Sequence, residues 1–359
     1  MVFLMDIERK IELVKRKPTE EIITEQSMRE IFEAYTHPKH YIGFEISGKV
    51  HLGTGVCTAL KIRDFLEAGV KPTIFLADYH SYINGKLGGN LEKIREIANG
   101  YFKHCFISLG LTEDKVKYVL ASDLYDADYW AEVLRIAKDT TMKRMLRCIT
   151  IMGRKEEEGM KSAVVFYPAM QAADIFMLDV QLAHAGMDQR KVHMLAHEIA
   201  SKGKPLAFAH HHLLPGLQSN QRMDPNMSKE DSVLEAKMSK SIAGSAIFIH
   251  DSEEEIKTNI KKAYCTEKQT EGNPVFEIAE YLLLREKPLK IERPAKFGGD
   301  LEIPDSAELA KIYSEGKLHP MDLKVAVAEE LAKVLKPCRD YFAKNKKYLE
   351  QMESAAITR

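Results

Sequence analysis

The first two thirds of the chain alternate short apolar runs with longer helical patterns, and this alternation most constrains the fold. The apolar runs are too short for buried helices and are bounded by polar residues or glycine. They lie at residues 41–46, 73–77, 118–121, 164–167 and 180–185, with helical patterns at 55–68, 91–109 and 129–147 between them. Strands separated by helices predict a doubly wound parallel α/β sheet. Ligands bind such sheets at the carboxyl ends of the strands.

The pattern changes after residue 213. Residues 213–237 are rich in Pro, Gly, Asn, Gln, Ser and Asp, which predicts a loop, and residues 246–250 predict a last short strand. The remaining chain is mainly helical, with patterns at 252–263, 274–285, 305–315 and 321–347. We therefore expect two domains, residues 1–250 and residues 251–359.

Composition excludes several classes of protein. The 359 residues include 20 Gly and 13 Pro, too few for a collagen-like chain, and the net charge of -1 excludes a protein that coats nucleic acid by bulk charge. No apolar run reaches the length of a membrane helix, and residues 1–5 are too short for a signal peptide. The five cysteines lack metal-site spacing, so we expect reduced thiols in a cytoplasmic protein.

One stretch departs from this even charge balance. Residues 143–155 carry five basic side chains and no acidic one. This stretch is either a solvated helix face or a contact for a polyanion.

The strongest motif is Lys237-Met238-Ser239-Lys240-Ser241, which follows the polar loop. A given pentapeptide matches by chance in about one of 10⁴ chains of this length. Two ammonium groups three residues apart on a loop can converge on one triphosphate, and lysine can follow a phosphate that moves. The alternative is a surface loop with two lysines. The partial copy at 226–230 lacks the leading lysine and ends in an acid, so we assign it no site.

A second motif is His51-Leu52-Gly53-Thr54-Gly55, which follows the first predicted strand. Its glycines allow backbone to approach a ligand, and the helix that follows offers free N–H groups to an anion. His51 can donate a hydrogen bond to a phosphate. Such a turn occurs in many α/β proteins, so it gains weight only beside the lysine loop.

Together these segments resemble the HIGH and KMSKS signatures of class I aminoacyl-tRNA synthetases, with Thr54 where the first pattern has a second His. Further segments resemble the archaeal and eukaryotic branch of the tyrosyl-tRNA synthetase family. These are Tyr41-Ile42-Gly43-Phe44-Glu45, Phe75-Leu76-Ala77-Asp78, Tyr167-Pro168-Ala169-Met170-Gln171-Ala172-Ala173-Asp174-Ile175, Gly186-Met187-Asp188-Gln189-Arg190-Lys191 and Phe297-Gly298-Gly299-Asp300.

The resemblance implies a Rossmann-like catalytic domain over residues 1–250, with a connective segment at about 110–150, and a helical anticodon-binding domain over 251–359. It implies the activation of L-tyrosine by ATP with Mg²⁺, then transfer of tyrosyl to tRNA(Tyr), by a cytoplasmic homodimer. We expect no structural metal. The residues implied in phosphate chemistry and ATP binding are His51, Gly53, Thr54, Lys237, Ser239 and Lys240.

The resemblance also implies an amino-acid pocket. Tyr41 and Asp174 would hold the substrate phenol, and Tyr167, Gln171 and Gln189 would hold its ammonium group. Tyr167, Gln171 and Asp174 are spaced i, i+4 and i+7, which places them on one face of a helix. In the second domain, Asp300 would accept hydrogen bonds from the guanine at the first anticodon position. A turn aspartate is the alternative for Asp300.

Three other functions share part of this pattern. A tryptophanyl-tRNA synthetase carries both signatures, but its indole substrate has no phenol for Tyr41 and Asp174 to bind. An inactive paralogue that binds RNA does not need the lysine loop. A small-molecule adenylyltransferase has no use for a helical domain of about 100 residues.

Several histidines are candidate metal ligands, and one cysteine is a candidate nucleophile. His193 and His197 have an i, i+4 spacing that zinc sites use, but no third ligand is evident, so we interpret them as structural. The run 210–212 cannot bind one ion, because neighbouring residues of a strand point in opposite directions. Cys57 has no adjacent base that would make it a nucleophile.

Overall fold

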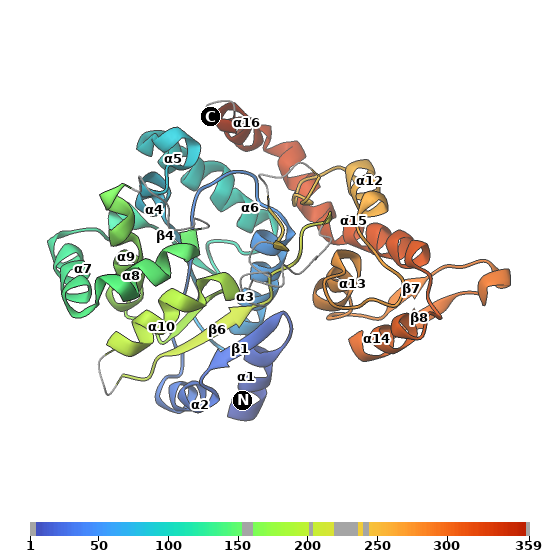
Figure 1. Cartoon of the computed structure of the whole chain (residues 1–359), viewed down its shortest axis with the longest axis horizontal. Coiled ribbons are helices and arrows are strands. Elements are labelled where there is room, and N and C mark those ends of the chain that lie inside the picture. The colour runs from blue at the N-terminus through green and yellow to red at the C-terminus, as the bar shows by residue number, and fades with distance from the viewer. Residues whose placement is uncertain (1–4, 153–160, 201–203, 219–235, 240–243, 357–359) are drawn as a thin grey trace. The chain divides into compact units, whose positions relative to one another are not determined.

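The computed structural model describes residues 5–152, 161–200, 204–218, 236–239 and 244–356 (Figure 1). Its internal contacts divide the chain into two compact units. The first unit comprises residues 1–48, 61–211 and 347–359, and the second comprises residues 49–60 and 212–346. Within the described residues, no helix combines the length and apolarity needed to cross a lipid bilayer.

A six-stranded sheet forms the centre of the first unit, in the order β1-β6-β5-β2-β3-β4. All neighbouring strands are parallel except β1, which pairs antiparallel with β6 at one edge. The predicted doubly wound parallel sheet is therefore confirmed. The strands are β1 (Thr19–Ile23), β2 (His40–Phe44), β3 (Thr73–Leu76), β4 (Lys117–Leu120), β5 (Leu182–Gly186) and β6 (Ala207–His211).

The strand order reverses direction between β2 and β5. From β2 the chain continues to β3 and β4 on one side, whereas β5 and β6 lie on the other. Only His40 and Tyr41 of β2 pair with β5, so ladder pairing stops before the carboxyl ends of these strands. A reversal of this kind is the place where α/β sheets bind ligands.

Helices cover both faces of the sheet (Figure 1). Side chains alternate along a strand, so Ala207 and Ala209 of β6 join the core on one face and Phe208 joins the core on the other. The first core contains residues of α1 (Ile7–Lys15), α2 (Glu25–Ala34) and α3 (Thr58–Glu67). The second contains residues of α7 (Ala127–Asp139), α8 (Met142–Cys148), α9 (Tyr167–Met177) and α10 (Arg190–Ile199). The remaining helices of this unit are α4 (Asp78–Ile83), α5 (Leu91–Ile97), α6 (Lys103–Ser108) and α16 (Lys346–Ala356).

Three local expectations were wrong. Residues 164–167 form the end of a 3-10 turn (Ser162–Phe166) that leads into α9, because Pro168 suits the first turn of a helix. Residues 246–250 contain an isolated bridge at Phe248 instead of a strand. The pattern at 129–147 is two helices, because Thr141 caps a new helix, α8, with its side chain.

The second unit is mainly helical. Its helices are α12 (Glu253–Lys262), α13 (Pro274–Ile278), α14 (Ser306–Ser314) and α15 (Pro320–Lys344), and α12 packs along α15. Ser252 and Glu255 form a capping box that fixes the start of α12. A short antiparallel pair, β7 (Leu289–Ile291) and β8 (Leu301–Ile303), precedes α14. The helical character predicted for this region is confirmed.

The helix α16 packs within the first unit. Its Tyr348 ring stacks on the His104 ring of α6, with centroids 3.6 Å apart and planes 17° apart. Gly100 lies so close to Gln351 that an added Cβ would come within 2.2 Å of Oε1. The position of α16 thus depends on a glycine in residues 98–102, directly before α6.

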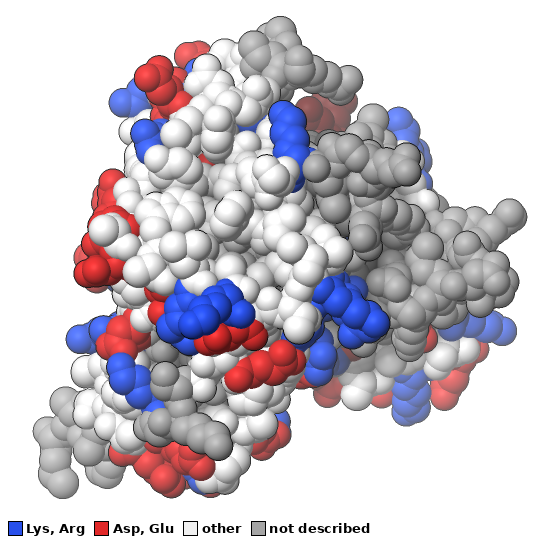
Figure 2. Space-filling view, turned by 60° about the vertical axis from the view of Figure 1, so that its left-hand side comes forward, with Lys and Arg blue, Asp and Glu red and all other residues white. Residues whose placement is uncertain are grey.

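Some large apolar side chains on this unit are exposed. Trp130 and Leu134 of α7 and Met142 of α8 are 39%, 62% and 61% exposed. Figure 2 turns the side of Figure 1 that carries α7 and α8 towards the reader and shows a broad uncharged area with charges of both signs around it.

Candidate functional site

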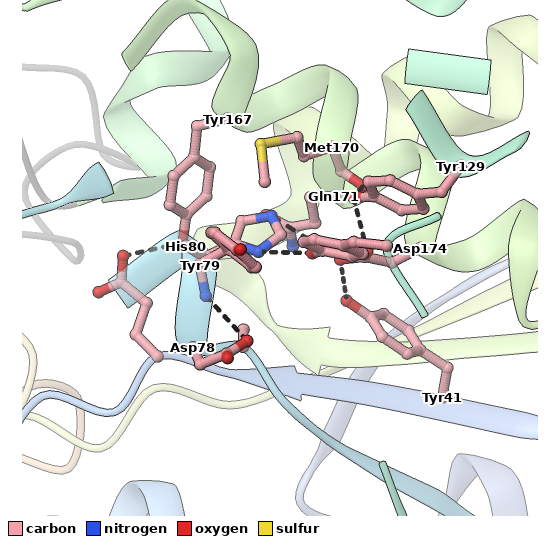
Figure 3. Close-up of polar contacts among 12 residues, drawn as sticks. Tyr41, Asp78, Tyr79, His80, Tyr129, Tyr167, Met170, Gln171 and Asp174 are labelled. Atoms are coloured by element: carbon pink, nitrogen blue, oxygen red, sulfur yellow. Dashed lines mark hydrogen bonds and ion pairs between the residues drawn. The ribbon is translucent and has the colours of Figure 1, made fainter. Parts of the chain in front are cut away.

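The helix α9 presents a row of buried polar side chains to the sheet. It begins at Tyr167 and carries Gln171 and Asp174 one and two turns later. Tyr167, Gln171 and Asp174 are 5%, 9% and 0% exposed. Buried polar groups of this kind must find partners, and Figure 3 shows that their partners come from several other elements.

Tyrosine hydroxyls surround the carboxylate of Asp174. The hydroxyls of Tyr125 and Tyr129 each donate to Oδ1 at 3.0 Å. The hydroxyl of Tyr41, on β2, lies 3.5 Å from Oδ2, which is a long contact (Figure 3). Among the described residues, no lysine or arginine pairs with this carboxylate. Oδ1 therefore has two close donors, and Oδ2 has none.

Burial without a cation changes the acidity of this group. Desolvation raises the pKa of Asp174 to about 8, against the smaller opposing effect of the tyrosine hydroxyls. Desolvation and the nearby carboxylate also raise the pKa values of Tyr41, Tyr125 and Tyr129, so these phenols stay protonated as donors. When Asp174 is ionised, its Oδ2 is therefore the oxygen that can accept a further hydrogen bond.

His80, on α4, joins the same cluster. Its Nδ1 is 3.1 Å from the hydroxyl of Tyr125, and its Nε2 is 3.7 Å from Oδ2 of Asp174. Burial lowers the pKa of His80 to about 3, so the imidazole is neutral and the second contact is not an ion pair. Nε2 is buried and has no hydrogen-bond partner among the described residues.

A second carboxylate lies at the other end of the row. Glu45, just after β2, accepts from the hydroxyl of Tyr167 at 2.8 Å and from the amide of Asn84 at 2.7 Å. Lys86 is 3.4 Å from its other oxygen. This acidic group beside Tyr167 suits a bound ammonium ion.

The amide side chains connect in sequence. Gln171 donates to Oε1 of Gln189 at 3.2 Å, and Gln189 donates to the backbone carbonyl of Ile151 at 3.1 Å. Gln189 stands at the start of α10, directly after β5. Because the nitrogen of the Gln171 amide is the donor to Gln189, the orientation of this amide is fixed, and its Oε1 can accept a hydrogen bond. The five residues expected to bind the amino acid thus lie in this unit, on α9, on β2 and after β5.

The segment with His51 lies in the second unit. Residues 50–52 run antiparallel to 247–249, with a bridge between His51 and Phe248. Thr54 Oγ1 is 3.2 Å from Nε2 of His51, and a Cβ on Gly53 would come within 3.2 Å of the His51 ring. The threonine thus holds the histidine ring, and glycine leaves room for it.

The start of the lysine loop is held in the same unit. Lys237 forms an antiparallel bridge with Pro215, and the N–H of Met238 donates to Leu214 at 2.7 Å. Met238 is buried, so its neighbours Lys237 and Ser239 point to the opposite side of this extended segment. Lys240 and Ser241 lie outside the described residues.

The other histidines have structural partners. His193 pairs with His210 at 2.9 Å, and His210 also pairs with Glu21. His211 turns instead to His184, at 2.8 Å. The alternation expected along residues 210–212 is therefore correct. Within the described residues, no group of three or more His, Cys, Asp or Glu is placed to hold a metal ion.

The buried position of Cys57 also weighs against reactivity. Burial raises the pKa of its thiol to about 12, which leaves almost no thiolate.

Sequence reasoning missed Glu45, His80, Tyr125 and Tyr129 as members of the site. Tyr125 and Tyr129 are spaced i, i+4, which is a signal for a shared direction, but Tyr125 precedes the helix that contains Tyr129. The rings stack with centroids 3.8 Å apart. No local pattern links them to Asp174, because that contact spans more than forty positions of the chain.

Comparisons with known proteins identify the family. The family model for class I tRNA synthetases (W and Y) matches residues 34–336. A tyrosine--tRNA ligase of Thermococcus kodakarensis is 51% identical over 99% of this chain and 100% of that protein. One of Pyrococcus furiosus is 48% identical over the same shares.

Solved structures give the same result. The tyrosyl-tRNA synthetase of Pyrococcus horikoshii, solved with L-tyrosine, has a TM-score of 0.91 at 47% identity and covers 98% of this chain and 100% of its own. A Plasmodium falciparum tryptophanyl-tRNA synthetase has a TM-score of 0.65 at 20% identity, covers 97% of this chain and 87% of its own, and shows a shared fold alone.

The parallel sheet, the His51 segment and the lysine loop together define a class I aminoacyl-tRNA synthetase, an enzyme class that uses ATP as a substrate. The chain belongs to the class I tRNA synthetase family of the tryptophan and tyrosine enzymes, and within it to the tyrosyl branch of the archaeal and eukaryotic type.

Proposed function

We propose that this enzyme activates L-tyrosine with ATP and transfers the tyrosyl group to tRNA(Tyr). The observation that carries this proposal is the environment of Asp174. Its Oδ2 lies beside the hydroxyl of Tyr41 in a buried site to which the described part of the chain brings no lysine or arginine. A substrate phenol needs one acceptor for its proton and one donor for its oxygen, and these two groups supply both. An indole offers a single N–H donor and no oxygen that could accept a hydrogen bond from the hydroxyl of Tyr41.

The same row of side chains provides a place for the substrate ammonium. Glu45, Tyr167 and Gln171 present oxygen atoms at the end of the row away from Asp174. Glu45 adds a negative charge to the three residues named from the sequence. A pocket with a phenol acceptor at one end and an ammonium acceptor at the other matches free tyrosine.

The reaction would proceed by positioning and charge stabilisation. A carboxylate oxygen of tyrosine attacks the α-phosphorus of Mg·ATP, a P–O bond forms, and the bond to the β-phosphate breaks to release pyrophosphate. A terminal ribose hydroxyl of the tRNA then attacks the tyrosyl carbonyl carbon and AMP leaves. His51, Lys237 and Lys240 would stabilise charge that grows on the phosphates, with Gly53, Thr54 and Ser239 completing the ATP site.

The decisive test is ATP–pyrophosphate exchange with tyrosine, tryptophan and phenylalanine in parallel. We expect exchange with tyrosine alone at low substrate concentration. Exchange driven by tryptophan would reassign the enzyme, and no exchange with any of the three would show a chain that does not activate amino acids.

The lysine loop is tested by Lys240→Ala. We expect slow adenylate formation with nearly unchanged tyrosine affinity, because the ammonium acts on charge that develops in the transition state. Rapid-quench measurement of adenylate separates the two steps, and an unchanged rate would remove the loop from the mechanism.

For residues 251–359 we propose anticodon binding, with Asp300 as the reader of the first anticodon base. Asp300 is exposed and directly precedes β8, after Gly298 and Gly299, whose φ angles of 100° and 75° need glycine. Its Oδ1 accepts from the N–H of Arg293 at 2.9 Å, so the carboxylate has a fixed direction. A guanine edge offers two N–H donors, which a carboxylate can accept.

Two substitutions separate the reading of the base from the shape of the turn. Asp300→Asn keeps an acceptor for the Arg293 N–H but loses the charge, whereas Asp300→Ala loses both. Both should lower kcat/KM for charging without changing pyrophosphate exchange, and both should lose the preference for guanine. If only the alanine variant is impaired, Asp300 supports the turn and does not read the base.

We further infer a homodimer that works in the cytoplasm. The exposed apolar residues of α7 and α8 fall within the predicted connective segment at about 110–150 and supply a face for a second copy. None of the five cysteines, all of which the structure describes, forms a disulfide, which suits a reducing compartment. Sedimentation of the wild type and of Leu134→Glu tests the dimer, which the charge should dissociate.

A further inference from the structure

His80 is a buried polar group of the amino-acid pocket to which the proposed reaction assigns no task. The imidazole is 2% exposed and stands between Tyr125 and Asp174. It contacts the ring of Tyr167 edge-on, with centroids 4.5 Å apart, so packing holds it from the other side. A buried ring with one bonded and one unpartnered nitrogen can adopt only a few proton arrangements.

The hydroxyl of Tyr125 has one proton and two neighbours. Asp174 Oδ1 lies 3.0 Å away and His80 Nδ1 lies 3.1 Å away. When Asp174 is ionised, its oxygen is the stronger acceptor, because a hydrogen bond to a charged group is about twice as strong as one between neutral groups. The Tyr125 hydroxyl therefore donates its hydrogen bond to Asp174. Nδ1 of His80 must then carry a hydrogen, which it donates to the Tyr125 oxygen.

This assignment fixes the other nitrogen of His80. A neutral imidazole carries one N–H, so Nε2 is left as an acceptor. It faces Oδ2 of Asp174, also an acceptor, at 3.7 Å. These two acceptors need a donor hydrogen beside them. The hydroxyl of Tyr41 lies 3.5 Å from Oδ2, which is too far for a strong hydrogen bond. A substrate phenol would bring that hydrogen.

Tyr129 strengthens the asymmetry between the two carboxylate oxygens. Its hydroxyl also lies 3.0 Å from Oδ1, but it has a second acceptor, the backbone carbonyl of Met170, at 3.1 Å. Tyr125 is thus the donor whose direction depends on another side chain. Its ring is stacked against Tyr129, so removal of the hydroxyl leaves the ring in place.

We propose that His80 and Tyr125 are positioning residues for the selection of tyrosine: His80 Nδ1 directs the Tyr125 hydroxyl onto Oδ1 of Asp174, and Oδ2 is thereby kept for the substrate phenol. This inference rests on the proposed function, since it assigns a role within the same pocket. Neither residue needs to touch the reacting carboxylate or ATP.

Side-chain substitutions can test the two nitrogens of His80 separately. Asn places a polar group near the position of Nδ1, whereas Gln places one near the position of Nε2. His80→Asn should keep most of the discrimination between tyrosine and phenylalanine, and His80→Gln should lose about tenfold. Tyr125→Phe should lose about tenfold through a lower kcat/KM for tyrosine, with phenylalanine unchanged. Tyr118→Phe is the matched control, because its hydroxyl donates to the Leu111 carbonyl outside the pocket.

Exchange kinetics with both amino acids, together with calorimetric tyrosine binding and thermal melting, give the readout. Wild-type discrimination in Tyr125→Phe would overturn the proposal. So would equal losses for tyrosine and phenylalanine, which indicate support of the fold alone, or equal damage in His80→Asn and His80→Gln. Failure of the proposed function would look different, because the wild type itself would then show no exchange driven by tyrosine.

Discussion

Two of the buried carboxylates in the first unit, Asp64 and Asp174, differ in their surroundings. Asp64 is 1% exposed and lies 2.8 Å from the ammonium of Lys61, which is itself 0% exposed. That ammonium also donates to three backbone carbonyls, those of Leu13, Val14 and Arg16, at the end of α1. Asp174 is equally buried but has only hydroxyl donors.

The difference separates a structural cluster from a binding cluster. The charge of Asp64 is matched by a cation, and that cation binds the carbonyls that a helix end leaves unpaired. Every group is used, so the site has no capacity for a ligand. Among the residues that the structure describes, no cation matches the charge of Asp174, and its Oδ2 has no donor closer than 3.5 Å. Such a site costs stability until a substrate binds.

The largest effect on stability is expected at the structural cluster of Lys61 and Asp64. Lys61→Met removes the buried cation and leaves the carboxylate of Asp64 with the partly exposed guanidinium of Arg16 at 3.8 Å, which should lower the free energy of unfolding by about 3–5 kcal/mol. Urea denaturation measures this loss. The double variant Lys61→Met with Asp64→Leu should recover part of it, and no recovery would mean that the lysine acts through the helix carbonyls alone.

The opposite change in stability is expected at the binding cluster around Asp174. Asp174→Asn removes the charge but keeps one oxygen for Tyr125 and Tyr129, and we expect a stability gain of about 2 kcal/mol near pH 8 with loss of tyrosine activation. The folded pKa of about 8 lies above the ordinary 3.8, so the native state holds a proton between these values. Its contribution to stability is present below pH 3.8 and is lost as the pH rises through 8. A gain that grew towards low pH would contradict this account.

Tyrosine binding should depend on the same proton. A phenol donates to Oδ2 only when Asp174 is ionised, so affinity should rise about tenfold between pH 7 and pH 8.5, given a pKa of about 8 in the free enzyme. Calorimetry in buffers of different ionisation enthalpy should detect a released proton at pH 7. Binding that takes up a proton, or that ignores pH, would show that the phenol does not use this carboxylate.

The smallest effect is expected at a third buried carboxylate. Asp78 accepts from the N–H groups of Tyr79 and Ser122 through Oδ1 and from the half-exposed Arg95 through Oδ2. Asp78→Asn keeps the first two contacts and loses the ion pair, so the cost should be about 1 kcal/mol. Thermal melting at low and at high salt checks it. If Asp78→Asn lowered stability as much as Lys61→Met, the exposure of the paired cation would not determine how much each ion pair contributes to stability.

The sequence predicted the parts of the molecule that rest on local patterns. The spacing of Tyr167, Gln171 and Asp174 defines one face of a helix, and α9 has these residues on its buried side. The sheet could be predicted from the apolar runs, but β1 was missed because its residues, Thr19–Ile23, include two glutamates on an edge strand.

The rest depends on contacts between distant residues. The contacts of Asp174 with Tyr125, Tyr129 and His80 arise from the packing of three separate segments, which no single-segment pattern encodes. Glu45 is the last residue of the segment 41–45 that resembles the family, yet its hydrogen bond with Tyr167 spans more than a hundred residues. Lys61 precedes Asp64 by three residues on the same helix, so that pair could be predicted from spacing, whereas the environment of Asp174 becomes known only from residues distant in the chain.

The placement of α16 has a consequence for how the protein is made. Residues 347–359 belong with the first unit, although all of residues 212–346 of the second unit are synthesised before them. On the ribosome, the sheet and its helices must wait on the order of ten seconds for the segment that stacks on His104. During that interval the surface under α16 is uncovered, so a nascent chain would expose the side chains beside Gly100 until its final turns emerge.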